Sequence, residues 1–117
     1  MIASITELNL KNFWSYLFFI PHAVKSKIQA SKSEGIVSIA LGSEGLLTQR
    51  TLSVWQNEKA MRDYVKSGDH IKAMKIFAKH ANKSFTAHFE VDSPPTWQTA
   101  LDYLRKHGRE HYGKKES

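Results

Sequence analysis

The chain reads Thr51-Leu-Ser-Val-Trp-Gln-Asn-Glu-Lys-Ala-Met-Arg-Asp-Tyr-Val-Lys-Ser-Gly-Asp-His-Ile-Lys-Ala-Met74 at its centre, and this stretch decides the fold. Its apolar, β-branched start predicts a strand that ends at Trp55. Asn57 is a good N-cap for a helix that Gly68 is expected to terminate, and Asp69 is expected to cap a second helix. A strand followed by two short helices is typical of a small α+β sandwich. This order gathers four side chains into one neighbourhood: Trp55, Tyr64, His70 and Met74.

The segments before this stretch predict a strand, a helix and a second strand. Residues 2–8 favour a strand, and Asn12 is placed to cap a helix, which we expect Pro21 to kink or restart because proline removes a helix donor. Residues 36–41 favour another strand, and residues 42–45 carry the glycines of a turn. The strand that starts near Leu47 then completes an antiparallel hairpin.

After the central stretch, residues 85–91 alternate apolar and polar side chains, which is the clearest strand pattern in the chain. A last helix is expected after Pro94 and ends before Gly108. The predicted fold class is therefore α+β, a ferredoxin-like β-α-β-β-α-β sandwich with a C-terminal helix. We expect one domain over residues 1–108 and a basic, flexible tail over residues 109–117.

Composition excludes several classes of function. The chain has 117 residues, 41% of them hydrophobic, and no cysteine, which excludes disulfides, thiolate nucleophiles and Cys-ligated metals. The longest apolar run, residues 13–20, is far shorter than the roughly 20 residues that span a bilayer. We therefore expect a cytoplasmic protein with no membrane partner.

The net charge of +6 suggests nucleic acid, but its distribution argues against such a partner. Residues 105–116 hold five Lys or Arg and two Glu, so half of the excess lies in the polar C-terminal tail. The ferredoxin-like order also serves RNA-binding domains that stack bases on sheet aromatics. The strands here lack that aromatic run with flanking cations, so RNA binding is the weakest reading.

A sheet with helices on one face leaves its other face bare in a single chain. The predicted strands carry apolar residues on both faces, with Leu52 and Val54 on one and Trp55 on the other. An exposed apolar patch of that size is rare in monomers. We therefore expect a homodimer in which two sheets face each other, forming a dimeric α/β barrel.

The segments Leu52-Ser-Val-Trp55, Asn57-Glu-Lys-Ala-Met61 and Ser67-Gly-Asp-His70, with Tyr64 between them, resemble the dimeric α/β-barrel superfamily. This group includes antibiotic-biosynthesis-type monooxygenases, haem-degrading enzymes and spheroidene-monooxygenase-like proteins. The resemblance implies a monooxygenase that is either cofactor-free or haem-using. Haem-degrading members place their iron-ligating histidine where this chain has Met74. His70, one helical turn earlier, is the substitute that we expect.

The expected site lies between the sheet and the helices. His70 is the candidate catalytic residue, because the start of a helix disfavours its protonated form and a neutral imidazole serves as a base or an iron ligand. Both His70 and Arg50 also have structural readings, as a surface contact and as a strand salt bridge respectively. The side chains expected to bind a small apolar molecule are Trp55, Tyr64, Met74, Phe77 and Arg50.

Other histidines are expected to play no catalytic part. His88 lies opposite the Phe85 and Phe89 face of its strand, which places it at the expected dimer interface. The His107 and His111 pair lies in the tail, so no metal site is expected. Two functions therefore remain: cofactor-free or haem-dependent oxygenation of an apolar substrate, and a non-catalytic ligand-binding or interaction module on the same fold.

Overall fold

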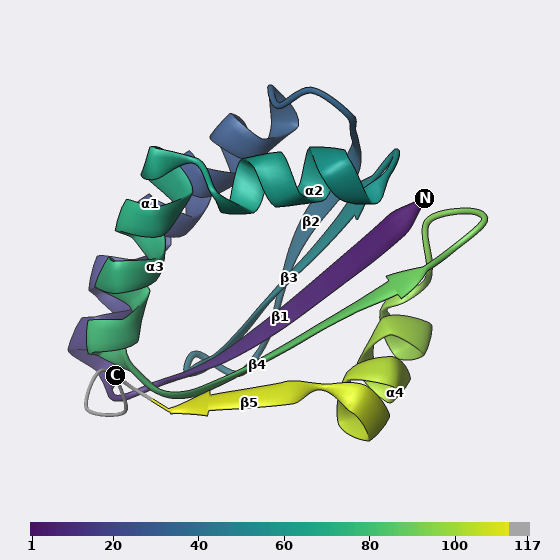
Figure 1. The fold of residues 1–117 in the computed structure, drawn as a ribbon. Coiled ribbons are helices and arrows are strands. Elements are labelled where there is room, and N and C mark those ends of the chain that lie inside the picture. The colour runs from purple at the N-terminus through teal and green to yellow at the C-terminus, as the bar shows by residue number, and fades with distance from the viewer. Residues whose placement is uncertain (113–117) are drawn as a thin grey trace.

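One antiparallel sheet and four helices make up the fold. The computed structural model describes residues 1–112, apart from the side chains of Asp69, His111 and Tyr112. Its strands occur in the spatial order β2-β3-β1-β4-β5. The elements are, in chain order, β1 (Ile2–Leu10), α1 (Phe13–Ser31), β2 (Ile36–Glu44), β3 (Thr48–Trp55), α2 (Glu58–Val65), α3 (Gly68–His80), β4 (Ala81–Glu90), α4 (Trp97–His107) and β5 (Arg109–Tyr112). The chain order and the central β3-β1 pair confirm the predicted ferredoxin-like α+β fold (Figure 1).

Helices cover both faces of the sheet, so the expectation of a bare face is wrong. Helices α1, α2 and α3 lie over one face and α4 lies over the other (Figure 1). Strand alternation sends one set of side chains toward α4, where Ala100 and Leu104 meet them. Trp97 extends this cover to Gly42 on the edge strand β2. The fully buried residues of this core are Ala3, Ile5, Leu52, Val54, Ala87, Ala100 and Leu104.

Helix α1 is continuous, so the expected restart at Pro21 does not occur. The helix starts at the predicted cap, where the Ser15 amide donates to Asn12 Oδ1 at 2.9 Å, and runs through Pro21 to Ser31. Pro21 lies on the exposed side of the helix. The proline ring has no N–H to donate, so one backbone carbonyl of the preceding turn lacks its helical donor, and water can hydrogen-bond to that carbonyl on the exposed side. Within the described chain, α1 and the other helices are too short or too polar to cross a membrane.

Two turn boundaries also differ from the predictions. Asn57 caps α2 as expected, with Oδ1 accepting from the Ala60 amide at 2.9 Å. Helix α3, however, begins at Gly68 and is capped by Ser67, whose Oγ accepts from the His70 amide at 3.3 Å. Gly68 therefore starts a helix instead of ending one, and the expected cap at Asp69 lies inside α3. The β2–β3 turn similarly falls at residues 45–47, because β2 continues to Glu44.

The expected tail begins with a strand. Residues 109–112 form β5 and pair with β4, with Phe85 opposite Glu110 in the register. Lys83 on β4 adds an ion pair to Glu110 at 3.5 Å. The described secondary structure therefore extends past residue 108, where the domain was predicted to end. The rest of the expected tail, residues 113–117, lies outside the described residues.

Gly35 joins α1 to β2 at a point that excludes any side chain. Its φ is +84°, and a Cβ built on it would collide with the Cβ of Ala60 on α2. We expect Gly35→Ala to lower the free energy of unfolding by about 2–4 kcal/mol, measured by urea denaturation. Gly45→Ala is the matched control, because Gly45 also has a positive φ of +68° but an open surrounding. Equal losses for the two variants would contradict the steric argument.

Candidate functional site

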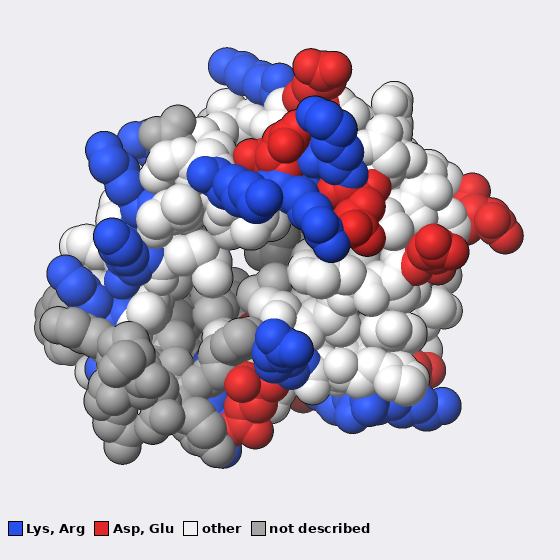
Figure 2. Space-filling view, viewed as in Figure 1, with Lys and Arg blue, Asp and Glu red and all other residues white. Residues whose placement is uncertain are grey.

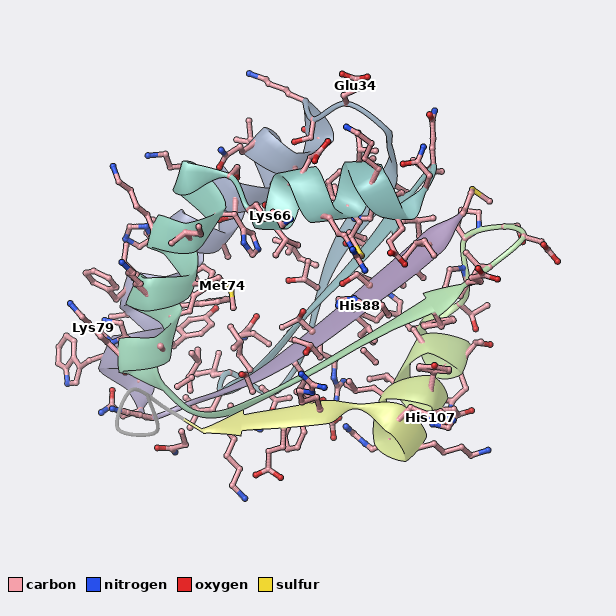
Figure 3. All side chains as sticks on the ribbon, in the orientation of Figure 1. Glu34, Lys66, Met74, Lys79, His88 and His107 are labelled. Atoms are coloured by element: carbon pink, nitrogen blue, oxygen red, sulfur yellow. The ribbon has the colours of Figure 1, made fainter. Side chains whose placement is uncertain are left out.

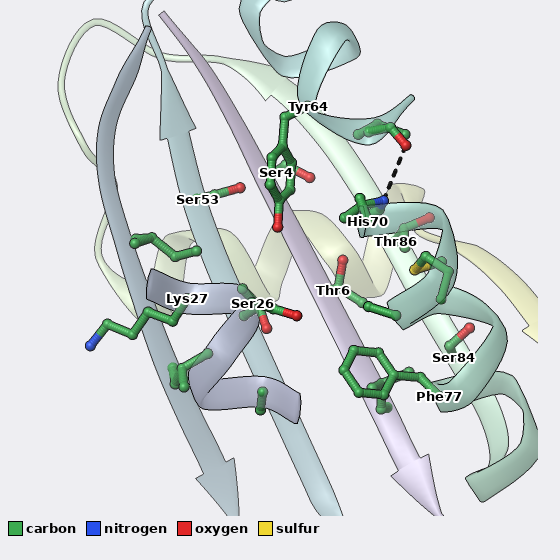
Figure 4. Close-up of a pocket in the computed structure, with 18 of the residues that line it drawn as sticks. Ser4, Thr6, Ser26, Lys27, Ser53, Tyr64, His70, Phe77, Ser84 and Thr86 are labelled. Carbon is green, nitrogen blue, oxygen red and sulfur yellow. Dashed lines mark hydrogen bonds between the residues drawn. The ribbon is translucent and has the colours of Figure 1, made fainter. Parts of the chain in front are cut away.

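A cavity of about 420 Å³ lies between the sheet and helices α1, α2 and α3. Its helical wall is largely apolar and aromatic, with Phe19 from α1, Met61 from α2 and Phe77 from α3, although Ser26 and Lys27 of α1 also line it. Its sheet wall is polar because strand alternation sends hydroxyl side chains to this face. Figure 4 shows these hydroxyls facing the helices across the cavity. A pocket of this size and mixed lining suits a small, largely apolar molecule with a few polar groups.

The polar wall consists of two rows that run across neighbouring strands. In the first row, Ser4 on β1 lies opposite Ser53 on β3 and His88 on β4. Thr6 forms a second row with Thr51 and Thr86 in the same way. The sequence analysis missed both rows. Their signal was the alternation of Ser and Thr along each strand, which a search for titratable residues passes over.

Trp55, Tyr64 and His70 form a continuous row of rings at one end of the cavity. Trp55 is buried, and its indole Nε1 donates to Ser53 Oγ at 3.0 Å. The Tyr64 ring lies 5.1 Å from Trp55 and 4.8 Å, edge to face, from His70. Burial raises the pKa of the Tyr64 phenol, so it stays a neutral hydrogen-bonding group. These three predicted site residues therefore meet at one place, as the sequence analysis expected.

His70 has a fixed orientation and a defined tautomer. Its Nδ1 lies 3.1 Å from the carbonyl oxygen of Val65, which links the start of α3 to the end of α2 (Figure 4). A carbonyl only accepts, so Nδ1 carries the hydrogen and Nε2 keeps its lone pair. Burial lowers the pKa of His70, and the Val65 bond opposes this only in part. His70 is therefore a neutral imidazole whose Nε2 can accept a proton.

His88 is a second histidine at the cavity, where the sequence analysis had expected a dimer contact. Its Nδ1 lies within hydrogen-bond distance of Ser4 Oγ, at 3.1 Å. Burial lowers the pKa of His88, Glu58 raises it and Arg62 lowers it. The alternation along β4 correctly placed His88 opposite Phe85 and Phe89. That face lies beneath the helices, however, and forms part of the cavity wall.

The remaining predicted ligand contacts divide between the two faces of the sheet. Met74 and Phe77 line the cavity from α3, and Figure 3 shows Met74 directed from α3 toward the sheet. Arg50 lies on the α4 face instead. Its Nε pairs with Glu7 at 2.7 Å and its guanidinium also reaches Glu44 at 2.8 Å. Arg50 thus makes the strand salt bridge that was its alternative reading, and it takes no part in the cavity.

His70 also has the donor arrangement of an axial haem ligand. A ligating histidine commonly donates its second ring N–H to a carbonyl, as His70 Nδ1 does to Val65. If haem were bound, His70 Nε2 would hold the iron, and the group would supply oxygen binding and activation. Among the side chains that the structure describes, no three from His, Asp or Glu gather in a metal-binding cluster.

The low pKa of the two cavity histidines gives a direct prediction. Because burial disfavours the charged ring, we expect His70 and His88 to titrate below the ordinary value of 6.5. Each folded-state pKa lies below the unfolded one, so stability falls as the pH drops from 6.5 through the folded values. An NMR titration of the histidine ring signals measures both midpoints. A midpoint above 6.5 for His70 would contradict its buried, neutral state.

Comparisons with known proteins give a consistent fold and no close relative. No family model matches the chain, and no curated protein matches it either. Among solved structures, SnoaB, a cofactor-independent oxygenase from Streptomyces nogalater, is similar with a TM-score of 0.68 and 12% identity over 79% of this chain and 93% of SnoaB. A Deinococcus radiodurans protein described as an antibiotic biosynthesis monooxygenase has a TM-score of 0.74 and 11% identity over 82% of this chain and 97% of its own.

A Nitrosomonas europaea protein described in the same way has a TM-score of 0.73 and 8% identity, covering 80% of this chain and all of its own. Identities this low establish the fold and leave the reaction open. The shared architecture agrees with the resemblance seen in the residues from Leu52 to His70. This chain therefore has the ferredoxin-like α+β fold of the antibiotic-biosynthesis-monooxygenase-like proteins.

Proposed function

We propose that this protein is a cofactor-independent monooxygenase that acts on a small apolar substrate with an acidic C–H group. The observation that carries the proposal is His70, a partly buried, neutral imidazole whose Nε2 keeps its lone pair at the end of the cavity. The apolar helical wall shields a carbanion from water. The structural similarity to SnoaB, itself a cofactor-independent oxygenase, supports the same reading.

The proposed reaction balances without an external reductant. His70 Nε2 removes a proton from a substrate methylene, and the carbanion adds to O₂ to give a peroxide anion, which takes a proton back from His70. The second methylene hydrogen then leaves as a proton, and the electron pair of its C–H bond forms the carbonyl of the product while the O–O bond breaks. The outer oxygen atom leaves as hydroxide, which takes up the proton and becomes water. All four electrons come from the two C–H bonds of the substrate.

The polar rows of the sheet have a separate part in this proposal. Ser4, Thr6 and their strand neighbours offer hydroxyls along one side of an otherwise apolar cavity. A substrate with oxygen groups along one edge would direct that edge to the sheet and its apolar face to the helices. This orientation brings the opposite edge to the helical side, where Tyr64 and His70 lie. The hydroxyls therefore orient the substrate, and His70 does the chemistry.

Oxygen uptake with dithranol tests the function. Dithranol is a flat tricyclic molecule whose methylene is made acidic by conjugation with a carbonyl across the ring, so it matches the proposed substrate class. We expect the protein, treated with a chelator, to speed O₂ uptake above the uncatalysed rate, with one labelled oxygen atom from O₂ in each product molecule. Dithranol binding without turnover would favour the non-catalytic module. A Soret shift on haem addition that His70→Ala abolishes would favour the haem-using alternative.

We also infer that the chain acts as a homodimer. The support is the edge strand β2, which carries the exposed apolar side chains Val37 and, at the rim of the cavity, Leu41, in a sheet whose other edge is extended by β5. A second copy could cover these side chains. Sedimentation velocity at micromolar concentration would report a dimer for the full chain. A monomer at every concentration would contradict this inference while leaving the cavity chemistry intact.

A further inference from the structure

The outer side of α1 exposes a stripe of large apolar side chains. Trp14 is 76% exposed, far more than any other large apolar residue among those described. The residues that α1 buries, Phe19 and Ala23 among them, lie on its opposite side. The exposed side chains repeat at helical spacing and so lie along one side of the helix. This α1 stripe consists of Trp14, Leu17, Phe18, Val24 and Ile28.

The surroundings of the α1 stripe are strongly basic. From Lys11 to Ser33 the chain has four lysines and no acidic residue, and from His70 to Phe89 it again has four lysines and no acidic residue. These two segments are neighbours, because the Phe18 ring on α1 lies 4.5 Å from the His80 ring on α3. Five exposed lysines of the two helices flank the stripe: Lys25, Lys32, Lys72, Lys75 and Lys79.

Apart from Asp69 in the first turn of α3, the acidic residues lie outside α1 and α3. Figure 2 shows blue side chains along the side of α3, while red and blue mix over α2 and on the opposite side. Figure 3 shows Lys79 at the outer edge of α3, directed away from the sheet. The ion pairs found between described residues use Arg50, Lys59, Arg62, Lys83 and Arg105 as their cations. None of these ion pairs uses a lysine beside the α1 stripe, so these lysines are placed to bind an external anion.

We propose that the α1 stripe and its flanking lysines dock the protein on an anionic lipid surface. Aromatic and aliphatic side chains on one side of a helix enter the acyl boundary, and the lysines beside them meet lipid phosphates. A second copy of this chain would bring two sets of lysines together without a counter-charge. Nucleic acid would satisfy the lysines but leave Trp14 and Leu17 exposed. Only a surface that is both apolar and anionic can contact the apolar side chains of the α1 stripe and the flanking lysines together.

This contact is distinct from a membrane span. The sequence analysis expects no membrane partner because no segment is long enough to cross a bilayer, and an in-plane contact needs no such segment. The proposal is also independent of the oxygenase chemistry, because the side chains of the α1 stripe are absent from the cavity wall.

Vesicle sedimentation of the full chain tests the proposal. We expect binding to vesicles of equal parts phosphatidylcholine and phosphatidylglycerol, and little binding to phosphatidylcholine alone. Raising NaCl from about 0.1 M to about 1 M, which shortens the Debye length from about 10 Å to about 3 Å, should weaken binding. Lys75→Glu with Lys79→Glu, and separately Trp14→Ala, should each weaken binding about tenfold or more.

Two further variants make the test specific. Lys106→Glu makes the same kind of charge change on α4, on the opposite side of the sheet, and should leave vesicle binding within about twofold. Trp14→Phe should keep binding but lose the blue shift of tryptophan fluorescence on vesicle addition, because Trp55 is already buried and Trp97 belongs to α4, on the other face of the sheet. A loss from Lys106→Glu as large as that from the double variant Lys75→Glu with Lys79→Glu, or absence of binding to anionic vesicles, would overturn the proposal. A dimer that Trp14→Ala dissociates without lipid would assign this face to a second copy instead.

Discussion

Replacing His70 by alanine is expected to lower the rate of dithranol oxygenation about 10²–10⁴-fold, the usual contribution of a positioned general base. The loss should appear in kcat more than in KM, because the apolar walls that hold the substrate remain. An oxygen electrode measures both constants. The wild-type rate should rise with pH as His70 deprotonates, with a midpoint below 6.5 because burial lowers its pKa.

The control for this variant separates chemistry from folding, because His70 also ties α3 to α2 through the Val65 carbonyl. His70→Asn places an amide N–H where Nδ1 donates, so it keeps that bond and loses the basic nitrogen. We expect His70→Asn to unfold like the wild type and to be as inactive as His70→Ala. Added imidazole should restore part of the activity of His70→Ala. Full activity in the Asn variant would exclude His70 as the base.

Removing Glu7 is expected to cause a large loss of stability. Glu7 is 4% exposed and accepts from Arg50 at 2.7 Å and from Arg105 at 3.2 Å. Glu7→Ala leaves the nearly buried Arg50 guanidinium without its inner partner, and we expect a loss of about 3 kcal/mol in the free energy of unfolding. In this variant Arg50 still has its ion pair with Glu44, so the expected loss of free energy lies at the low end of the range for a broken buried ion pair. Urea denaturation measures it, with Glu44→Gln on the exposed partner expected to cost less than about 1 kcal/mol.

The same carboxylate makes stability depend on acid pH. Burial raises the pKa of Glu7, but the hydrogen bonds and charges of Arg105 and Arg50 outweigh it and hold the pKa below its ordinary value of 4.5. The stabilisation is therefore complete above the unfolded pKa and is lost as the pH falls through the folded one. We expect the stability difference between wild type and Glu7→Gln to shrink between about pH 5 and about pH 2. An unchanged difference over this range would show that Glu7 is not the titrating group.

The sequence predicted the elements that local chemistry determines. Asn12 and Asn57 cap helices where expected, because a cap depends on a few neighbouring residues. The local errors are the expected restart at Pro21 and the expected cap at Asp69, in place of which Ser67 caps α3. Ser67 and Asp69 are both good caps two positions apart, and only the path from α2 to α3 selects the first. Strand β5 is four residues long, too short for alternation to reveal it.

The site was predictable in part, and the rest depended on long-range register. Trp55, Tyr64 and His70 meet because they lie within one continuous stretch of sixteen residues, as a count from the printed sequence shows. Arg50 was misplaced because its partner Glu7 lies opposite it only in the β1–β3 register. His88 was placed on the correct side of its strand, but whether that side met helices or another copy depended on where α4 packs.

The distance between the reacting carbon of bound dithranol and His70 Nε2 tests the central claim most directly. A crystal structure of the complex, grown without oxygen, would give this distance. We predict a flat ligand between the sheet and helices α1, α2 and α3, with its methylene carbon about 3–3.5 Å from Nε2. A ligand bound in the cavity with its methylene far from His70, or a ring whose Nε2 faces solvent, would contradict the account.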